Sequence, residues 1–478
     1  MTDVIDLEQL QARLATVVGA EHVRALPDEA TYGGLLSPRL AAEQRPRAVV
    51  QPASAEQLQR LAPMLAELGH GLWSSANGCG NGAQAGHRRK PGVLIDLSRM
   101  NRIIEVDRHA GCALIEAGVS YVQLAAHVRE RDLPLWLDAD ANGAHAVAGS
   151  VAARHWGLTP YGDHQAAQCG LEVVLANGAL LRTGMGALPG SDCWARYKYN
   201  FGPALDGLFS RAHFGVVTKL GLWLMPAPRR FVPYTLRLPD LAALATVVER
   251  LRPRLLDGTL SGRPLFASRA SDAALLTRAG QASSAGNAAP WTLYGGLYGL
   301  PDIVETHWQT LAETLAGVGA ARLEREGDGP AWPLRLKQLR GEPVYSDAAA
   351  ADTSPLWFGL LAPPSAADAR ALHHGVLARL AEWMPRVTFQ LAPRLLAMDV
   401  EIDTQAADHE DARQAALAAV KDLVTAGYGL RHACPELDDI LAARHTHPGL
   451  RHLENGLSTA LDPYATLATR GRFKRGKR

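Results

Sequence analysis

The sequence predicts an α+β fold of two or three structural units, and three observations support this prediction. The chain has 478 residues, more than one domain usually contains. Hydrophobic residues make up 47% of it and charged residues 20%, a composition that supplies large packed cores. Short apolar runs alternate with helical patterns as far as Pro226 and Pro228, and mainly helical patterns follow these two prolines.

In the first part of the chain, apolar and β-branched runs bounded by glycine, proline or charged residues indicate strands. They lie at 47–52, at 69–75, twice within 93–107, and at 112–118. Helical patterns lie at 1–18, 54–68 and 119–133. Ser54 is the expected N-cap of the second helix. Two apolar runs around Asn177 and Gly178 predict a hairpin over 171–184, and a β-rich run follows at 214–228.

After residue 228, apolar residues at helical spacing predict longer helices. These lie at 241–256, 303–318 and 409–427. A strand is expected at 356–363, and the segment 258–290, rich in serine, alanine and glycine, is expected to be a mobile loop. The stretch 459–473 is too short to form a domain, so it is expected to pack back on the rest of the chain.

Charge and cysteine content narrow the class of protein. The formal net charge is +1, so no overall charge favours nucleic acid or a membrane surface. The basic run 470–478 is typical of a solvated tail, with docking to an acidic partner as the alternative. The five cysteines are widely spaced, which predicts neither a disulfide framework nor a metal site. With no long apolar stretch and no basic leader, the expected location is the cytoplasm.

Three glycine-rich segments are candidates for contact with a long ligand. Glycines at 78, 80 and 82 follow an apolar strand and allow backbone N–H groups to converge on an anion such as a pyrophosphate. An ordinary glycine loop is the alternative, because the spacing is neither that of a Walker loop nor that of a Rossmann turn. The segments 145–157 and 201–226 also place small residues where backbone can approach a ligand.

Several longer stretches resemble the flavoprotein oxidases that include vanillyl-alcohol oxidase, eugenol oxidase and the flavoprotein subunit of p-cresol methylhydroxylase. The resemblance is carried by GLTPYGDH (157–164), LEVVLANGALLRTGMGALPGS (171–191) and YKYNFGPALDGLFSRAHFGVVTKLGLWLMP (197–226). It is ungapped over most of 93–226 and weaker in the C-terminal half, where AGYGLRH (426–432) contributes.

This resemblance implies a two-subdomain FAD-binding domain of the p-cresol methylhydroxylase type and a cap domain of antiparallel sheet flanked by helices. The FAD-binding domain would comprise 1–228, completed by about 441–478, and the cap would comprise 229–440. The pyrophosphate would lie on Gly78, Cys79, Gly80, Asn81, Gly82 and Ala83. Further FAD contacts would come from Val119, Ser120, Gly149, Ser150, Thr159, Pro160, Gly162, Asp163, His164, Gly215 and Val217.

The sequence departs from the family at positions that decide the chemistry. Asn81 and Leu430 stand where the phenol oxidases carry tyrosines that bind phenolate, so of that group only Arg431 remains. Ala153 replaces the acidic residue near flavin N5. In the cap strand 394–403, a leucine aligns with the histidine that carries the covalent flavin link. With fewer donors to stabilise a phenolate, we expect a substrate other than a standard para-alkylphenol, and non-covalent FAD.

Four side chains are candidates for catalysis or for the substrate pocket, beside Ala153 and Leu430. Arg431 offers a fork of donors to a substrate anion, or else caps nearby carbonyls. His155 is a candidate base, with a structural role as the alternative. Tyr161 would line the flavin or pack with its hydroxyl satisfied, and Trp357 would form a pocket wall or belong to the core.

The function predicted is that of an FAD-dependent oxidase or dehydrogenase, which takes hydride from a small, aromatic or otherwise activated substrate to flavin N5. The alternative is a flavin-binding partner subunit or a degenerate family member with little turnover. An electron acceptor protein or oxygen would reoxidise the flavin, and a homodimer is expected. No nucleic acid, membrane or metal is expected.

Overall fold

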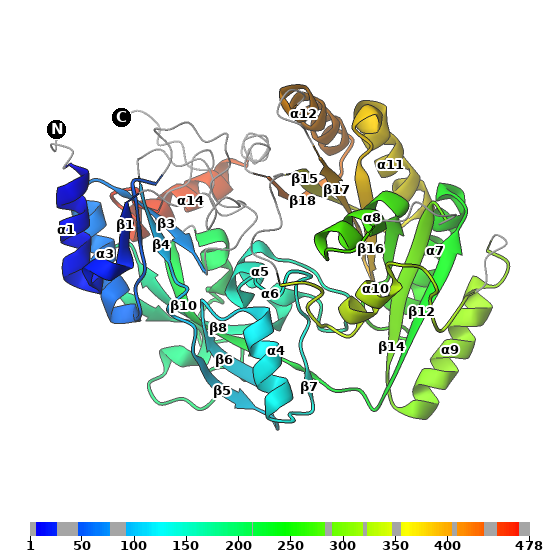
Figure 1. Ribbon diagram of the computed structural model, residues 1–478, viewed down its shortest axis with the longest axis horizontal. Coiled ribbons are helices and arrows are strands. Elements are labelled where there is room, and N and C mark those ends of the chain that lie inside the picture. The colour runs from blue at the N-terminus through cyan, green and yellow to red at the C-terminus, as the bar shows by residue number, and fades with distance from the viewer. Residues whose placement is uncertain are drawn as a thin grey trace.

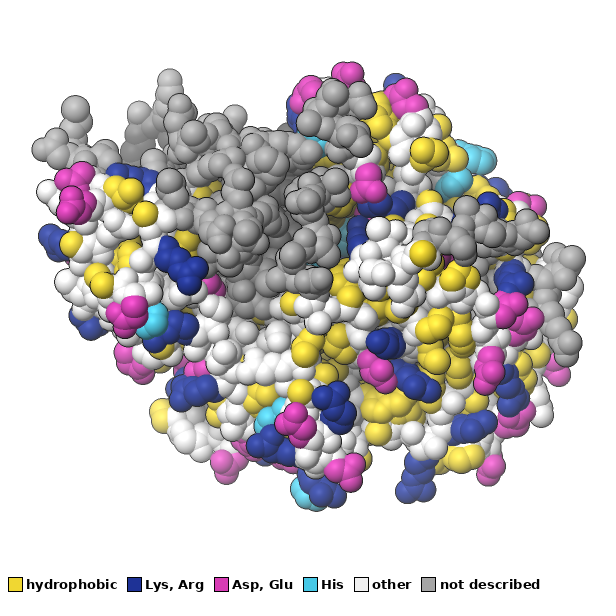
Figure 2. All heavy atoms as spheres, in the orientation of Figure 1, with side chains coloured by type: hydrophobic (Ala, Val, Ile, Leu, Met, Phe, Trp, Pro, Cys, Tyr) yellow, Lys and Arg dark blue, Asp and Glu magenta, His cyan; other side chains and the backbone are white. Residues whose placement is uncertain are grey.

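The computed structural model describes residues 6–25, 46–76, 92–212, 214–282, 289–318, 323–346, 355–403, 409–434 and 447–467. It contains both helices and sheets, arranged in two regions (Figure 1). The N-terminal region consists of the described residues up to 227 together with 447–467. The seven-stranded region consists of the described residues from 230 to 434. Figure 2 shows acidic and basic side chains interspersed on the visible face of both regions.

A four-stranded sheet forms the first part of the N-terminal region. Its order is β1 (Val23–Ala25), β2 (Ala48–Val50), β4 (Gly92–Asp96) and β3 (Gly71–Ser75), with β2, β4 and β3 parallel. Helix α3 (Ala55–Glu67) makes the crossover from β2 to β3 that parallel pairing requires. Ser54 caps this helix by accepting a hydrogen bond from the backbone of Gln57, as predicted. Helix α1 (Leu7–Val18) packs beside α3.

A five-stranded antiparallel sheet forms the second part. Its order is β5 (Ile103–Asp107), β6 (Cys112–Glu116), β10 (Gly215–Trp223), β8 (Gln168–Leu175) and β9 (Leu180–Arg182). The predicted hairpin is confirmed as β8–β9, and Gly178 at its turn has φ +84°, which suits glycine. Helical segments surround this sheet: α4 (Tyr121–Glu130), α5 (Val147–Ala153), α6 (His164–Ala167), η3 (Gly184–Ala187) and η4 (Asp206–Ala212). Strands β7 (Leu135–Trp136) and β11 (Met225–Pro226) pair separately.

The seven-stranded region is one antiparallel sheet. Its order is β12 (Arg230–Leu238), β14 (Trp291–Gly299), β13 (Leu265–Ser268), β16 (Arg386–Ala392), β17 (Leu395–Ile402), β15 (Leu356–Ala362) and β18 (Gly429–Ala433). The helices around it are α7 (Leu241–Leu256), α8 (Arg269–Arg278), α9 (Pro301–Leu315), α10 (Trp332–Leu339), α11 (Ala366–Leu380) and α12 (His409–Thr425) (Figure 1). The expected antiparallel sheet flanked by helices is therefore confirmed.

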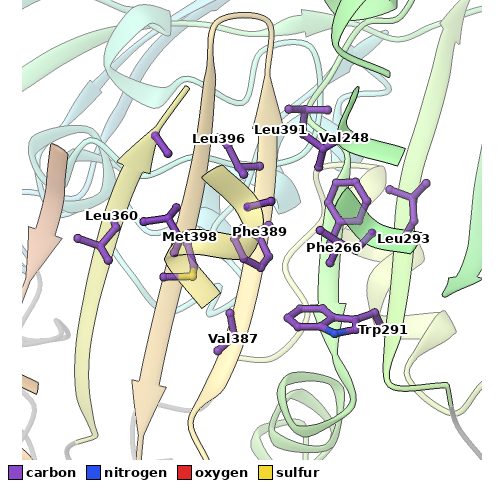
Figure 3. Close-up of a cluster of buried hydrophobic side chains, with 14 of the residues drawn as sticks. Val248, Phe266, Trp291, Leu293, Leu360, Val387, Phe389, Leu391, Leu396 and Met398 are labelled. Carbon is purple, nitrogen blue, oxygen red and sulfur yellow. The ribbon is translucent and has the colours of Figure 1, made fainter. Parts of the chain in front are cut away.

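The core of this region lies between the sheet and helices α7, α9, α11 and α12. Figure 3 shows Phe266, Phe389 and Met398 among its side chains, and all three are fully buried. The rings of Trp291 and Phe389 are in contact, with centroids 5.7 Å apart. Burying an aromatic or aliphatic side chain of this size stabilises the fold by about 2 kcal/mol each. This packing therefore joins the sheet to its helices in one hydrophobic core.

The prediction of a mobile loop over 258–290 was wrong for residues 265–278. The segment contains β13, which is an internal strand of the sheet, and α8, whose N-cap Ser268 accepts a hydrogen bond from the backbone of Ser271. Leu275 and Leu276 on α8 are buried. The many small residues of this segment gave no strand or helix pattern, because tertiary contacts rather than local propensity stabilise β13 and α8.

The chain returns to the N-terminal region near its end, as predicted. Helix α14 (Pro448–Leu461) precedes a short segment in which Leu467 is buried in the core around β2 and β4. The backbone carbonyl of Thr466 accepts a hydrogen bond from Leu72 on β3, at 2.8 Å. In the part of the chain that the structure describes, no helix is both long and apolar enough to cross a membrane.

Candidate active site

At one of the places where the two regions meet, strands β16, β17, β15 and β18 face the segment 138–164. The backbone carbonyl of Trp156 accepts a hydrogen bond from Gln390 Nε2, and the carbonyl of Arg154 accepts one from Arg431 Nη2, both at 3.5 Å. The rings of His155 and His432 also meet there, with centroids 6.3 Å apart. Since both regions supply polar side chains at this junction, it is the candidate active site.

A β-bulge in β18 orients two of these side chains. Gly359 on β15 lies opposite His432, and the next residue, Leu360, lies opposite Leu430, which leaves Arg431 as an extra residue. In a regular strand Arg431 and His432 would point to opposite faces of the sheet. Here both reach Asp399 on β17, with Arg431 Nη1 at 3.3 Å from Oδ2 and His432 Nε2 at 2.9 Å from Oδ1. The bulge therefore assembles the Arg431–Asp399–His432 cluster.

Gly359 provides the space that this cluster occupies. It pairs with Asp399 on one side and with His432 on the other. A Cβ atom at Gly359 would lie 2.5 Å from Asp399 Oδ1 and 2.6 Å from His432 Nε2, closer than such atoms approach in proteins. The absence of a side chain here lets the carboxylate and the imidazole meet over the strand between them.

The protonation states of the cluster follow from its burial and its charges. Burial by itself would raise the pKa of Asp399, but Arg431 and His432 lower it to about 2. Burial lowers the pKa of His432, and the charge of Arg431 lowers it further, against the opposing effect of Asp399. At neutral pH, Asp399 is therefore ionised and His432 is neutral.

Asp140 organises the matching side chains of the N-terminal region. Its Oδ2 atom accepts hydrogen bonds from His145 Nδ1 at 3.0 Å, from the Ser150 hydroxyl at 3.2 Å and from His155 Nδ1 at 3.3 Å. Although burial opposes it, the two histidines hold the pKa of Asp140 well below its usual value. Burial would likewise lower the pKa of His145, but Asp140 raises it. His155 and His432 are thus each paired with a carboxylate of their own region, Asp140 and Asp399 respectively.

Trp156 joins the two regions through stacked cations. The guanidinium of Arg431 lies 4.3 Å from the centre of its ring, and that of Arg263, which precedes β13, lies at 4.8 Å. Arg263 also approaches Asp163, at 3.5 Å. Each such cation–π contact stabilises by about 0.5–2 kcal/mol, depending on how far the pair is removed from water.

A second buried network lies behind Asp140. His164 Nε2 is 2.9 Å from Asp138 Oδ1, and the Tyr121 hydroxyl is 3.2 Å from His164 Nδ1. The other oxygen of Asp138 accepts a hydrogen bond from the backbone of Thr159, at 2.9 Å. Burial raises the pKa of Tyr121 well above its usual value, so its hydroxyl stays protonated. This network fixes the turn 157–164, which carries several of the predicted FAD contacts.

A hollow in the N-terminal region has the composition that a flat aromatic ligand requires. It is shallow and partly open to solvent, and small or apolar side chains from α5 and β10 line it, including Ala148, Ala152 and Val217. Gln165 and Ser210 add hydrogen-bonding groups. Small apolar walls with a few polar groups are typical of cofactor pockets, so the side-chain chemistry of this lining suits part of an FAD molecule.

The structure brings some predicted FAD-binding residues to this part of the molecule and gives others structural contacts. Gly78 to Ala83 lie outside the described residues. Ser120 caps α4 and Asp163 caps α6. Of the other predicted contacts in the N-terminal region, the buried ones are Val119, Ser150, Thr159, Gly162, His164 and Gly215, the half-buried ones are Gly149 and Val217, and Pro160 is exposed.

The predicted catalytic and pocket residues fall into two groups. Arg431, His155 and Trp357 lie in or beside the junction, and the ring of Trp357 meets that of His432 edge-on at 5.2 Å. Ala153 ends α5, just before His155. Leu430 pairs with β15 and packs against the core of the seven-stranded region. Tyr161 has 37% of its surface exposed, and its role stays a prediction.

Four residues of the junction escaped the sequence analysis. Asp399 gave no signal because its partner Arg431 lies 32 residues further along the chain. The partners of Asp140 lie only 5 to 15 residues away, but no regular spacing links them to it. His432 stood beside Arg431 without any sign of the bulge. Gly359 is a single glycine in a strand, which often marks close approach of another group. The glycine at 359 could therefore have indicated a close contact over this strand.

Comparison with known proteins agrees with this architecture. A family described as FAD binding domain matches residues 46–184. The chain is 29% identical to the 4-cresol dehydrogenase [hydroxylating] flavoprotein subunit of Pseudomonas putida, over 95% of this chain and 93% of that protein. It is also 29% identical to 1'-carboxy-chondrochloren decarboxylase of Chondromyces crocatus, over 68% of this chain and 56% of that protein.

Solved structures show the same fold over nearly the whole chain. The complex of 4-ethylphenol oxidase from Gulosibacter chungangensis with isoeugenol has a TM-score of 0.86 at 23% identity, and covers 98% of both chains. Substrate-bound p-cresol methylhydroxylase has a TM-score of 0.84 at 26% identity, and covers 98% of this chain and 97% of its own. The resemblance to the FAD-dependent oxidoreductases that include p-cresol methylhydroxylase is therefore confirmed over nearly the whole chain.

Proposed function

We propose that this oxidoreductase oxidises a small organic substrate held at the junction of the two regions, with His155 as the proton acceptor. The observation that carries the proposal is the pairing of His155 with Asp140 at a junction that also contains Arg431 and His432. The same proposal places the FAD-binding domain at 1–228, completed by about 441–478, and the cap at 229–440.

Bound FAD would accept the hydride from the substrate carbon. The predicted contacts in α5, the turn 157–164 and β10 would hold the cofactor, and the packing of the Asp138–His164–Tyr121 network would keep that turn in place. We propose that the FAD is not covalently linked, because the cap strand 394–403 contains no histidine.

His155 has the environment of a general base. Asp140 Oδ2 accepts a hydrogen bond from Nδ1, which fixes the tautomer and leaves Nε2 as the proton-accepting atom. The ring is 29% exposed, so it is reachable from the junction. Ala153, two residues earlier, removes the carboxylate that the family resemblance places near flavin N5, and His155 would take over proton transfer from it.

The substrate is proposed to differ from a standard para-alkylphenol. Phenol oxidation benefits from donors that stabilise a phenolate, and here the charge of Arg431 is already balanced by Asp399. Leu430 has no donor to offer, and it packs against a core. Para-alkylphenols such as those named for the relatives should therefore be poor substrates.

Partners of the enzyme are also proposals. The relative from Pseudomonas putida is named as a flavoprotein subunit, which favours an electron acceptor protein as the partner of this chain, with oxygen as the other candidate. A homodimer and a cytoplasmic location are proposed on the sequence alone.

The test is anaerobic reduction of the flavin. Purified protein should be yellow, acid should release its FAD, and the flavin absorbance should bleach with at least one compound from a panel of phenols, alcohols, amines and hydroxy acids. His155→Asn should slow bleaching by about 10²-fold, since general base catalysis typically contributes that much or more. The control His109→Asn, at an exposed turn between β5 and β6, should have no effect.

Two outcomes would overturn the proposal. Protein that neither contains nor takes up FAD contradicts flavin chemistry altogether. Flavin that no compound bleaches, in protein that forms a stable complex with another protein, would support a partner subunit or a degenerate family member instead.

A further inference from the structure

Three buried polar atoms of the Arg431–Asp399–His432 cluster have no hydrogen-bond partner among the described residues. These are Arg431 Nε, His432 Nδ1 and Asp399 Oδ1, and Asp399 Oδ1 lies 2.9 Å from His432 Nε2 without the geometry of a hydrogen bond. The side chain of Arg431 is only 8% exposed and that of His432 only 12% exposed. A buried polar atom left unpaired costs about 1–3 kcal/mol, so native proteins pair nearly all of them. Unpaired atoms in a pre-formed cluster indicate where a ligand supplies the partners.

The charges at the junction are already balanced without a ligand. Arg431 is paired with Asp399 at 3.3 Å. Arg263, the other cation on Trp156, approaches Asp163, and His145 rests on the carboxylate of Asp140. An anion entering here would meet three cations, Arg431, Arg263 and His145, that already face carboxylates in the described part of the chain, and burying it would carry a large desolvation cost. A neutral polar group carries no such penalty.

The two unpaired nitrogens require opposite hydrogen-bonding partners. The guanidinium of Arg431 can only donate. In His432, Nε2 faces Asp399 and therefore carries the proton, which leaves Nδ1 as an acceptor when the ring is neutral. A ligand must thus accept a hydrogen bond from Arg431 and donate one to His432. A hydroxyl group does both, whereas a carboxylate or a phenolate has no proton to donate.

We propose that the Arg431–Asp399–His432 cluster binds a neutral hydroxyl group, so that the substrate is recognised as an uncharged alcohol rather than as an anion. This inference rests on the proposed function, because it assigns the substrate class of the same site. It assigns His432 as a specificity residue and Asp399 as the group that orients both of its neighbours. It also explains why residue 359 is glycine. Any side chain there would push Asp399 and His432 apart, and their pairing is what leaves His432 Nδ1 as an acceptor.

The experiment compares alcohols and carboxylates of the same carbon skeleton on FAD-loaded protein. The probes are benzyl alcohol with benzoate, 2-phenylethanol with phenylacetate, and cinnamyl alcohol with cinnamate, titrated anaerobically by calorimetry and by the flavin difference spectrum. Wild-type protein should bind at least one alcohol about tenfold more tightly than its carboxylate, a ratio that corresponds to the loss of one buried hydrogen bond.

Two variants reverse or remove this preference. Asp399→Asn frees the charge of Arg431, and should tighten carboxylate binding about tenfold while it weakens alcohol binding. His432→Phe keeps a ring but removes the acceptor, so it should weaken alcohol binding five- to tenfold and leave the carboxylate unchanged. Asp403→Asn is the matched control, because Asp403 lies just beyond the end of the same strand and pairs with Arg386 instead. It should change neither affinity.

The inference is overturned if carboxylates bind wild-type protein as tightly as the alcohols, if no alcohol in the series binds, or if His432→Phe leaves the ratio unchanged. The last comparison stands even where Asp399→Asn does not fold. Failure of the proposed function looks different. Flavin that never bleaches refutes turnover without changing the measured binding preference, whereas carboxylates that bind more tightly than the alcohols refute the hydroxyl site and leave the oxidoreductase intact.

Discussion

His155 and His432 face each other across the junction of the two regions, with ring centroids 6.3 Å apart and ring planes inclined at 74°. Each imidazole is held by a carboxylate of its own region, Asp140 for His155 and Asp399 for His432. The junction therefore has two imidazoles with different carboxylate partners, and the following variants separate their contributions.

The pairing of His145 with Asp140 predicts a dependence of stability on pH. Its folded pKa is raised above the usual 6.5, so folding favours the protonated form. The stabilisation is complete below about pH 6.5 and is lost as the pH rises through the raised folded value. Wild-type protein should thus exceed His145→Asn in free energy of unfolding by more at pH 5.5 than at pH 8.5, measured by urea titration. A difference that grows with pH would contradict this.

Asp399 predicts the opposite dependence in acid. Its folded pKa is about 2, below the unfolded value of about 3.9, so ionisation stabilises the folded state by about 2 kcal/mol above pH 4. This contribution is lost as the pH falls from about 4 to about 2. The difference in unfolding free energy between wild type and Asp399→Asn should therefore shrink over that range. A constant difference would show that the pair does not depend on the charge of Asp399.

Much of the fold could be predicted from local sequence, and the junction could not. Periodicity and capping located α3, α7 and the β8–β9 hairpin, because apolar spacing and turn chemistry are local properties. Segment 258–290 was mistaken for a loop because its strand and helix depend on neighbours far away in the chain. Arg431 and His155 were found as reactive residue types, but their counter-ions come from other strands and turns. The bulge depends on register, which one sequence does not reveal.

Gly359→Ala tests the space over β15. The new Cβ would lie about 2.5 Å from Asp399 and His432 atoms, so one of the two must move and the pair must separate. We expect a loss of about 1–3 kcal/mol in unfolding free energy, as for overpacking of a core, together with weaker alcohol binding. Gly202→Ala is the control, since nothing lies within 4 Å of its Cβ position. Equal stability of the two variants would refute the steric argument.

The buried Asp138–His164–Tyr121 network should stabilise the fold and hold FAD. Tyr121→Phe removes only the hydroxyl that meets His164 Nδ1, so it should cost about 1–2 kcal/mol in unfolding free energy. Asp138→Asn weakens the bonds to both His164 and Thr159 and should cost more.

Only the second of these variants should also release FAD, because Asp138 fixes the turn 157–164 through a backbone hydrogen bond and Tyr121 does not. Urea unfolding of FAD-free protein measures the first effect, and fluorescence of released flavin measures the second. Tyr197→Phe, at a ring that is 54% exposed, controls for loss of a tyrosine hydroxyl. Asp138→Asn could instead retain FAD as tightly as wild type while it destabilises the fold. The turn would then not contact the cofactor, and the predicted contacts at Thr159, Gly162 and His164 would all be wrong.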